Sequence, residues 1–119
     1  TYNNVVDSIF TYLDSKIKEL ESFNIKNIII DPGFGFGKTI DHNFEILSNL
    51  EKFKEFEKPL LAGISRKSMI YKFLNISPDK ALNGTSVLNT IALNKGADIL
   101  RVHDILEAKE CLALFNKLN

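Results

Sequence analysis

The sequence of 119 residues predicts an α/β fold with a parallel β-sheet. Three short apolar runs alternate with longer segments in which apolar residues recur at steps of three and four positions. The runs end at Asp31, Ile64 and Val102, which are 33 and 38 residues apart, the usual length of a strand, a helix and a return. Because strands that alternate with helices form parallel sheets, we expect the element order α-βα-βα-βα.

The N-terminal segment is predicted to be one helix, because its apolar residues share a face from Val5 to Leu20, with Asn24 as a stop. The β-branched run at residues 27–30 predicts a buried first strand. A second helix is expected from about Asp41. Its apolar face carries Phe44, Leu47, Leu50 and Phe53.

The second apolar run, residues 60–64, predicts the next strand, and a short helix is expected over residues 68–74. Ser77 is predicted to cap a further helical turn that has Pro78 at its first position. Residues 87–94 are predicted to be helical, with Gly96 as a left-handed cap.

Residues 99–102 predict the third strand, and Asp104 with Glu107 resembles a capping box that begins the last helix. The apolar face of that helix carries Leu106, Leu112 and Leu114. We treat residues 1–119 as part of one domain. A complete (β/α)8 barrel needs about 250 residues, so the pattern predicts either a small open α/β sheet or the second half of a barrel.

Composition excludes several classes of protein. Lys plus Arg and Asp plus Glu both number 15, so no net charge favours nucleic acid or a membrane surface. The longest apolar runs are far shorter than the roughly 20 residues that span a bilayer. The single cysteine, Cys111, excludes an intramolecular disulfide, favours a cytoplasmic setting and is expected to be packed inside. The sequence has no metal-ligand cluster and no pair of carboxylates suited to hydrolysis.

Asp31 follows the first strand directly and begins a loop with glycines at positions 33, 35 and 37. The ending Gly37-Lys38-Thr39 is similar to a phosphate-binding P-loop, but that motif needs a glycine where Pro32 stands. A nucleotide-binding P-loop is therefore rejected. Two interpretations of Asp31 stay open: a carboxylate that binds a ligand, or an Asx turn that holds backbone amides.

Cationic side chains follow the other two strands. Arg66 and Lys67 come after Ser65, and Arg101 and His103 lie on one face of an extended segment. The alternatives are a solvated loop and a capped turn. Because the carboxyl ends of parallel strands meet, we expect these groups to surround Asp31 and to bind a polar, anionic ligand with a donor-rich head.

Three motifs together resemble dihydropteroate synthase over essentially the whole chain: Asp31-Pro-Gly-Phe-Gly-Phe-Gly-Lys38, Pro59-Leu-Leu-Ala-Gly-Ile-Ser-Arg-Lys-Ser68 and Ile99-Leu-Arg-Val-His-Asp104. The resemblance implies a transferase of folate biosynthesis with a TIM-type (β/α)8 barrel. It would condense 6-hydroxymethyl-7,8-dihydropterin pyrophosphate with 4-aminobenzoate to give 7,8-dihydropteroate and pyrophosphate, and sulfonamides would compete with the aminobenzoate.

The resemblance also implies a role for each matching residue. Asp31 is expected to bind the donor edge of the pterin, Lys67 its acceptor atoms, and Arg101 to stack on the ring. Met69 is expected to line the same pocket.

The pyrophosphate is expected to be bound by Arg101 and His103, so that Lys67, Arg101 and His103 are the catalytic candidates. Phe36, Ser65 and Arg66 are expected to border the aminobenzoate.

The family also uses a magnesium-binding Asn from the first strand, further pterin-binding residues from the middle strands, and two mobile loops. We expect Mg²⁺ and those residues to lie outside this chain, which is interpreted as the C-terminal half of the barrel, inactive alone and homodimeric when complete. The alternatives are a related pterin- or folate-binding methyltransferase barrel and a half-barrel without catalytic activity.

Overall fold

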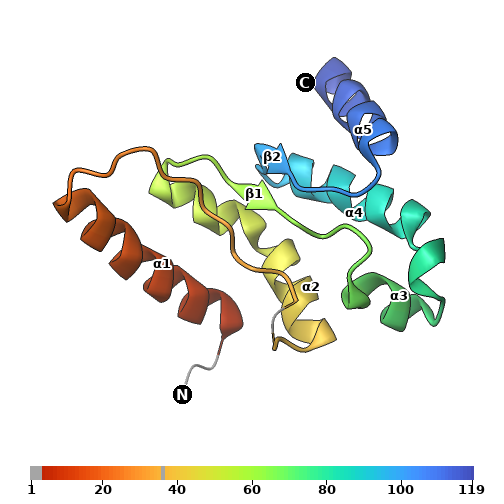
Figure 1. The fold of residues 1–119 in the computed structure, drawn as a ribbon, viewed down its shortest axis with the longest axis horizontal. Helices are drawn as coiled ribbons and strands as arrows, with labels where there is room; N and C mark the ends of the chain where they lie inside the picture. Colours follow the sequence, from red (N-terminus) through yellow and green to blue (C-terminus); the bar gives the residue numbers. More distant parts are fainter. Residues whose placement is uncertain (1–3, 36) are drawn as a thin grey trace.

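The structure of this protein is a computed structural model, which describes residues 4–35 and 37–119. The molecule is flat, with dimensions of 43 × 36 × 21 Å. Figure 1 shows helices α1 (Val5–Ser22) and α5 (Ile105–Leu118) at opposite sides, with the remaining helices and the short strands between them. The α/β class predicted from the sequence is confirmed.

The parallel sheet is much shorter than the sequence predicts. Strands β1 (Leu61–Ala62) and β2 (Ile99–Leu100) pair in parallel, with Leu61 opposite Ile99 and Ala62 opposite Leu100. The expected first strand is reduced to a single parallel bridge between Ile30 and Leu60. Its outer edge has no described neighbour to hydrogen-bond with, and Ile29 is 56% exposed. The first segment is therefore an edge of the short sheet.

The N-terminal helix begins as its sequence predicts. Asn4 caps α1, because its Oδ1 accepts hydrogen bonds from the N–H groups of Val6 and Asp7. The second predicted helix divides into α2 (Ile40–Ser48) and the 3₁₀ helix η1 (Leu50–Phe56). Phe10 of α1 stacks on Phe56 at a centroid distance of 4.3 Å, which fixes α1 against this segment.

The C-terminal half contains α3 (Ser68–Leu74), the 3₁₀ turn η2 (Pro78–Lys80) and α4 (Leu82–Asn94). The predicted bounds of α3 are confirmed, whereas α4 begins five residues before the predicted start at residue 87. Ser77 stands before the η2 turn but makes no side-chain cap. Gly96 adopts the predicted left-handed conformation, with φ of +104°.

The core lies between the parallel segments and the helices that pack on them. Its largest fully buried side chains include Phe34, Phe53, Ile46, Leu50, Leu60 and Ile64. In contrast, no residue of α5 is buried in the described structure, and Cys111 is half-buried rather than packed inside. Within the described part of the chain, no helix is both long and apolar enough to cross a membrane.

Candidate functional site

The candidate site lies where the three parallel segments end. Asp31 follows the Ile30 bridge, Ser65 to Lys67 follow β1, and Arg101 to His103 follow β2. A small pocket of about 120 Å³ opens here, which we call the strand-end hollow. It is lined by Gly63, Ser65, Lys67, Arg101, Val102 and His103. The structure therefore brings together residues from the second and third predicted motifs.

Asp31 uses its two carboxylate oxygens for different partners. Oδ1 accepts a hydrogen bond from the Gly33 N–H at 2.9 Å, which forms the Asx turn that the sequence allowed. Oδ2 pairs with Nη1 of Arg101 at 3.3 Å. The Arg101 side chain is 55% exposed, so this ion pair leaves most of the guanidinium open to solvent. The contact joins the first and third strand ends.

Arg101 lies directly over Gly63. A Cβ atom built on Gly63 would come within 2.5 Å of Arg101 Nη2, well below van der Waals contact. The absence of a side chain at position 63 thus makes room for the guanidinium beside the strand-end hollow. Gly63 could not be singled out from local sequence, because the reason for a glycine there is a contact with Arg101, 38 positions later.

The glycine-rich loop is held by contacts with side chains that follow it. Gly33, Gly35 and Gly37 have φ of +77°, +93° and +74°, a region that favours glycine. The Gly35 N–H donates to Oδ1 of Asn43, which is 2% exposed. Lys38 Nζ donates to the Gly33 carbonyl. Asn43 is a structural anchor whose role sequence reasoning missed.

Lys67 reaches across to the same loop. Its Nζ donates to the Phe34 carbonyl at 2.8 Å, 33 residues away in sequence. Burial lowers the pKa of Lys67, and the nearby charges of Arg101 and Lys38 lower it further, while Asp31 acts in the opposite direction. The ammonium group is therefore held in a crowded cationic region, which a bound anion would relieve.

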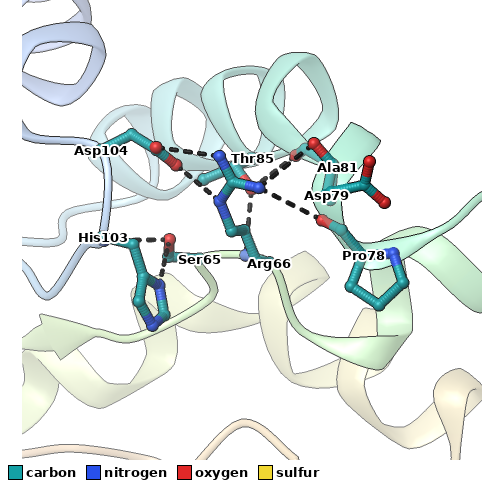
Figure 2. Close-up of polar contacts among 8 residues, drawn as sticks. All are labelled: Ser65, Arg66, Pro78, Asp79, Ala81, Thr85, His103 and Asp104. Carbon is teal, nitrogen blue, oxygen red and sulfur yellow. Dashed lines mark hydrogen bonds and ion pairs between the residues drawn. The ribbon is translucent and has the colours of Figure 1, made fainter.

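Ser65 and His103 contact each other across the two strand ends, as Figure 2 shows. The Ser65 hydroxyl lies 2.9 Å from His103 Nδ1, and the His103 backbone N–H donates to the same oxygen at 3.2 Å. Ser65 is 4% exposed. The imidazole is thus fixed in orientation, with the rest of its ring available at the strand-end hollow.

Arg66 is directed away from the hollow. Its Nε and Nη2 atoms donate to the two carboxylate oxygens of Asp104, both at 2.9 Å. Its Nη1 donates to the carbonyls of Pro78 and Asp79, both at 3.3 Å. Asp104 was predicted to cap α5, but no side-chain cap is present, because its carboxylate binds Arg66 instead.

The other predicted site residues lie elsewhere. Met69 is 1% exposed and lines an apolar groove between α2, α3 and α4 rather than the strand-end hollow. Phe36 lies outside the described residues. Thr85, which sequence reasoning missed as part of the site, accepts the Arg66 backbone N–H at 3.0 Å. No group of three or more His, Cys, Asp or Glu side chains in the described ranges could hold a metal ion.

The sequence is similar to a known protein family. Residues 1–103 match the family described as pterin binding enzyme. The chain is 41% identical over 113 residues to the dihydropteroate synthase of Escherichia coli K12, covering 93% of this chain and 40% of that protein.

Solved structures agree with the sequence comparison. The crystal structure of Yersinia pestis dihydropteroate synthase superposes with a TM-score of 0.94 and 35% identity, covering 99% of this chain and 49% of that one. The same enzyme with a pterine-sulfa conjugate gives a TM-score of 0.95 and 36% identity, covering 99% and 48%. The chain spans about 40% of the length of the first curated relative.

Proposed function

The chain belongs to the pterin-binding enzyme family, and from that premise we propose that the intact protein is a dihydropteroate synthase. It condenses 6-hydroxymethyl-7,8-dihydropterin pyrophosphate with 4-aminobenzoate and releases pyrophosphate. The observation that carries the proposal is the strand-end cluster of Asp31, Lys67, Arg101 and His103. Hydrogen bonds and the shared hollow hold these groups together, in a chain that matches this family over residues 1–103.

Asp31 and Lys67 have the chemistry to bind the two edges of a pterin. A carboxylate accepts two hydrogen bonds from an amino group and a neighbouring ring N–H, while an ammonium donates to ring acceptors. Arg101 presents a half-exposed guanidinium that can stack on a flat ring. When the pterin binds, its donor edge competes with Arg101 for the Asp31 carboxylate, and the guanidinium is released toward the ring and the pyrophosphate.

The chemistry of the step is the departure of pyrophosphate. The arylamine nucleophile is neutral, so the main demand on the site is to stabilise negative charge on the leaving group. Arg101 and His103 are assigned this role because both line the strand-end hollow. The electron-rich pterin stabilises the positive charge that develops on the methylene, which gives the reaction an SN1-like character.

The remaining assignments follow from the family. Ser65 and Phe36 are proposed to border the aminobenzoate. Arg66 is directed away from the strand-end hollow, and Met69 lies in the apolar groove between α2, α3 and α4, so no substrate contact is proposed for these two residues. Mg²⁺ is expected to assist the departure of pyrophosphate. The family resemblance implies that its ligand residue lies outside this chain, so no step is assigned to the ion.

The architecture proposed for the intact protein is a (β/α)8 barrel, of which this chain forms the C-terminal half, in a cytoplasmic homodimer. The strand-end hollow of about 120 Å³ is smaller than the roughly 300–1,000 Å³ of usual small-molecule pockets. It therefore accounts for one part of a site that accepts two substrates.

The test is turnover by the intact protein with added Mg²⁺, followed as release of pyrophosphate and as formation of 7,8-dihydropteroate. Lys67→Ala is expected to lower kcat/KM by at least about 100-fold while the protein stays folded. The matched control is Lys72→Ala, which removes an exposed lysine from the following helix. A wild-type protein without turnover would overturn the proposed activity, and a folded Lys67→Ala protein with full turnover would overturn the role of Lys67.

A further inference from the structure

Residue 66 is anchored at both its backbone and its side chain. Its backbone N–H donates to Thr85 Oγ1 of α4, and that hydroxyl in turn donates to the Ala81 carbonyl. Thr85 is 2% exposed, so the anchor is inside the protein. The guanidinium meanwhile forms a bidentate pair with Asp104 and reaches the carbonyls of η2. Figure 2 shows the backbone of Arg66 in contact with Thr85 and its guanidinium in contact with Asp104 and η2.

The backbone of Arg66 is in an unusual conformation for its residue type. Its φ is +54°, in the left-handed region that L-residues other than glycine rarely adopt. Such a conformation persists where the surroundings hold it in place, as Thr85, Asp104 and η2 do here. The turn at this position directs the side chains of Ser65 and Lys67 toward the strand-end hollow and that of Arg66 to the opposite side.

The partner of Arg66 is itself next to a candidate catalytic residue. Asp104 follows His103, whose ring and backbone both contact Ser65, the residue before Arg66. The two strand ends are thus joined twice, by Ser65 with His103 and by Arg66 with Asp104. Because the members of each pair are neighbours in the chain, a backbone shift at one pair would also displace the other.

The electrostatics favour a persistent pair. The hydrogen bonds between Arg66 and Asp104 hold the pKa of the Asp104 carboxyl below its usual range. The same hydrogen bonds raise the pKa of the Arg66 guanidinium. Both groups are therefore charged over the physiological range. Their side chains are 28% and 21% exposed, so neither is a freely solvated surface charge. Bidentate pairs of this geometry fix orientation as well as supplying energy.

We propose that Arg66 and Asp104 form a clamp that positions Lys67 and His103 for the reaction, and that Arg66 acts through this clamp rather than by contacting the aminobenzoate. The Arg66–Asp104 clamp rests on the proposed function, because its main test uses that reaction. Arg66 is not among the described residues that line the strand-end hollow, and four of its hydrogen bonds are already made within the protein. The role of Arg66 in the clamp replaces the contact with the aminobenzoate that the family resemblance led us to expect.

The experiment measures steady-state kinetics of the intact protein carrying Arg66→Met, Asp104→Ala or both changes. Met keeps the apolar stem of the arginine without its charge. Each single variant is expected to lower kcat by about 100-fold, since a displacement of about 1 Å is enough for that loss. The double variant is expected to lose no more than either single variant, and KM for aminobenzoate is expected to change by less than about threefold.

The matched control is Lys58→Met, which breaks a long-range ion pair with Glu21 at the opposite end of β1. It is expected to keep wild-type kcat. Circular dichroism and thermal melting establish that each variant is folded, and Asp104→Asn serves as a milder variant if Asp104→Ala does not fold.

Two kinetic results would overturn the clamp. One is a selective rise in aminobenzoate KM for Arg66→Met together with wild-type behaviour of Asp104→Ala, because that pattern belongs to a substrate contact. The other is a double variant whose loss equals the product of the single losses, because independent groups behave in that way.

An NMR measurement separates failure of the clamp from failure of the proposed activity. The ring ¹⁵N resonances of His103, assigned by their loss in His103→Gln, report its contact with Ser65. The clamp predicts that Arg66→Met and Asp104→Ala both shift these resonances and that Lys58→Met does not. Unchanged His103 resonances in the two clamp variants would overturn the proposal even if the wild-type protein had no synthase activity.

Discussion

Replacing Gly63 by alanine is expected to separate activity from stability. The new Cβ would lie 2.5 Å from Nη2 of Arg101 and 3.0 Å from its Cζ. Non-bonded heavy atoms settle at about 3.5 Å or more, so the guanidinium must move by about 1 Å. Its side chain is 55% exposed and can swing outward without disturbing the core. The substitution therefore displaces Arg101 rather than the strand.

The two contributions to stability are small and opposed. Loss of the exposed ion pair between Arg101 and Asp31 costs at most about 1 kcal/mol. Alanine in an extended segment gains about 0.5–1 kcal/mol over glycine, and Gly63 has no positive φ that alanine would resist. We therefore expect the free energy of unfolding to change by less than about 1 kcal/mol, measured by denaturant titration of the intact protein.

The effect on activity is expected to be larger. A displacement of about 1 Å in a group that stabilises the leaving pyrophosphate lowers kcat/KM by about 100-fold, which is about 2.7 kcal/mol of transition-state stabilisation. Arg101→Ala should show a loss at least as large, and adding Gly63→Ala to it should cause no further loss. Wild-type kcat/KM in Gly63→Ala, or two losses that multiply in the double variant, would refute the reasoning.

Three further predictions concern stability. Gly84→Ala places a Cβ 2.5 Å from Ile70 Cγ2. The overpacking should cost about 1–3 kcal/mol of folding free energy, which outweighs a helix-propensity gain of up to about 1 kcal/mol. Ile70→Leu removes that methyl group, so a double-mutant cycle should show that it relieves the loss. Because Arg66 lowers the pKa of Asp104, the ionised carboxylate stabilises the folded protein above the usual carboxyl pKa of about 3.9. Wild type should melt at a higher temperature than Asp104→Asn there, and the difference should shrink as the pH falls through the lowered pKa; a constant difference would contradict this. Asn4→Ala should cost about 1 kcal/mol in denaturant titration, by loss of the α1 cap.

Local patterns were sufficient to predict most helices. Asn4 lies before an apolar periodic segment, and the structure begins α1 at the next residue. The bounds of α3 were also predicted, because Ser68 to Leu74 stand between a polar turn and Asn75, which adopts the left-handed conformation. In these segments the residues that begin or end a helix lie within one or two turns of it, so the local sequence is sufficient to predict its bounds.

The strands and the site contacts depend on residues far away in sequence. The predicted strand at residues 27–30 shrinks to one bridge, since strand pairing needs a neighbour that the local pattern does not reveal. Asp104 was expected to cap α5, yet a guanidinium 38 residues earlier takes its carboxylate. The sequence predicted that charged groups would meet at the strand ends, but not which of them would pair with one another.

The contacts of Arg66 and Asp104 explain how two neighbouring motifs form one site. The turn at Arg66, whose φ is +54°, leaves Ser65 and Lys67 lining the strand-end hollow and directs Arg66 outward. The third motif likewise contributes Arg101 and His103 to the hollow, and the next residue, Asp104, reaches the outer side. The outward guanidinium of Arg66 thus meets the outward carboxylate of Asp104, with both carboxylate oxygens 2.9 Å from guanidinium nitrogens. The outer residues join the two strand ends, and the inner residues of both motifs are thereby held in register around a single ligand.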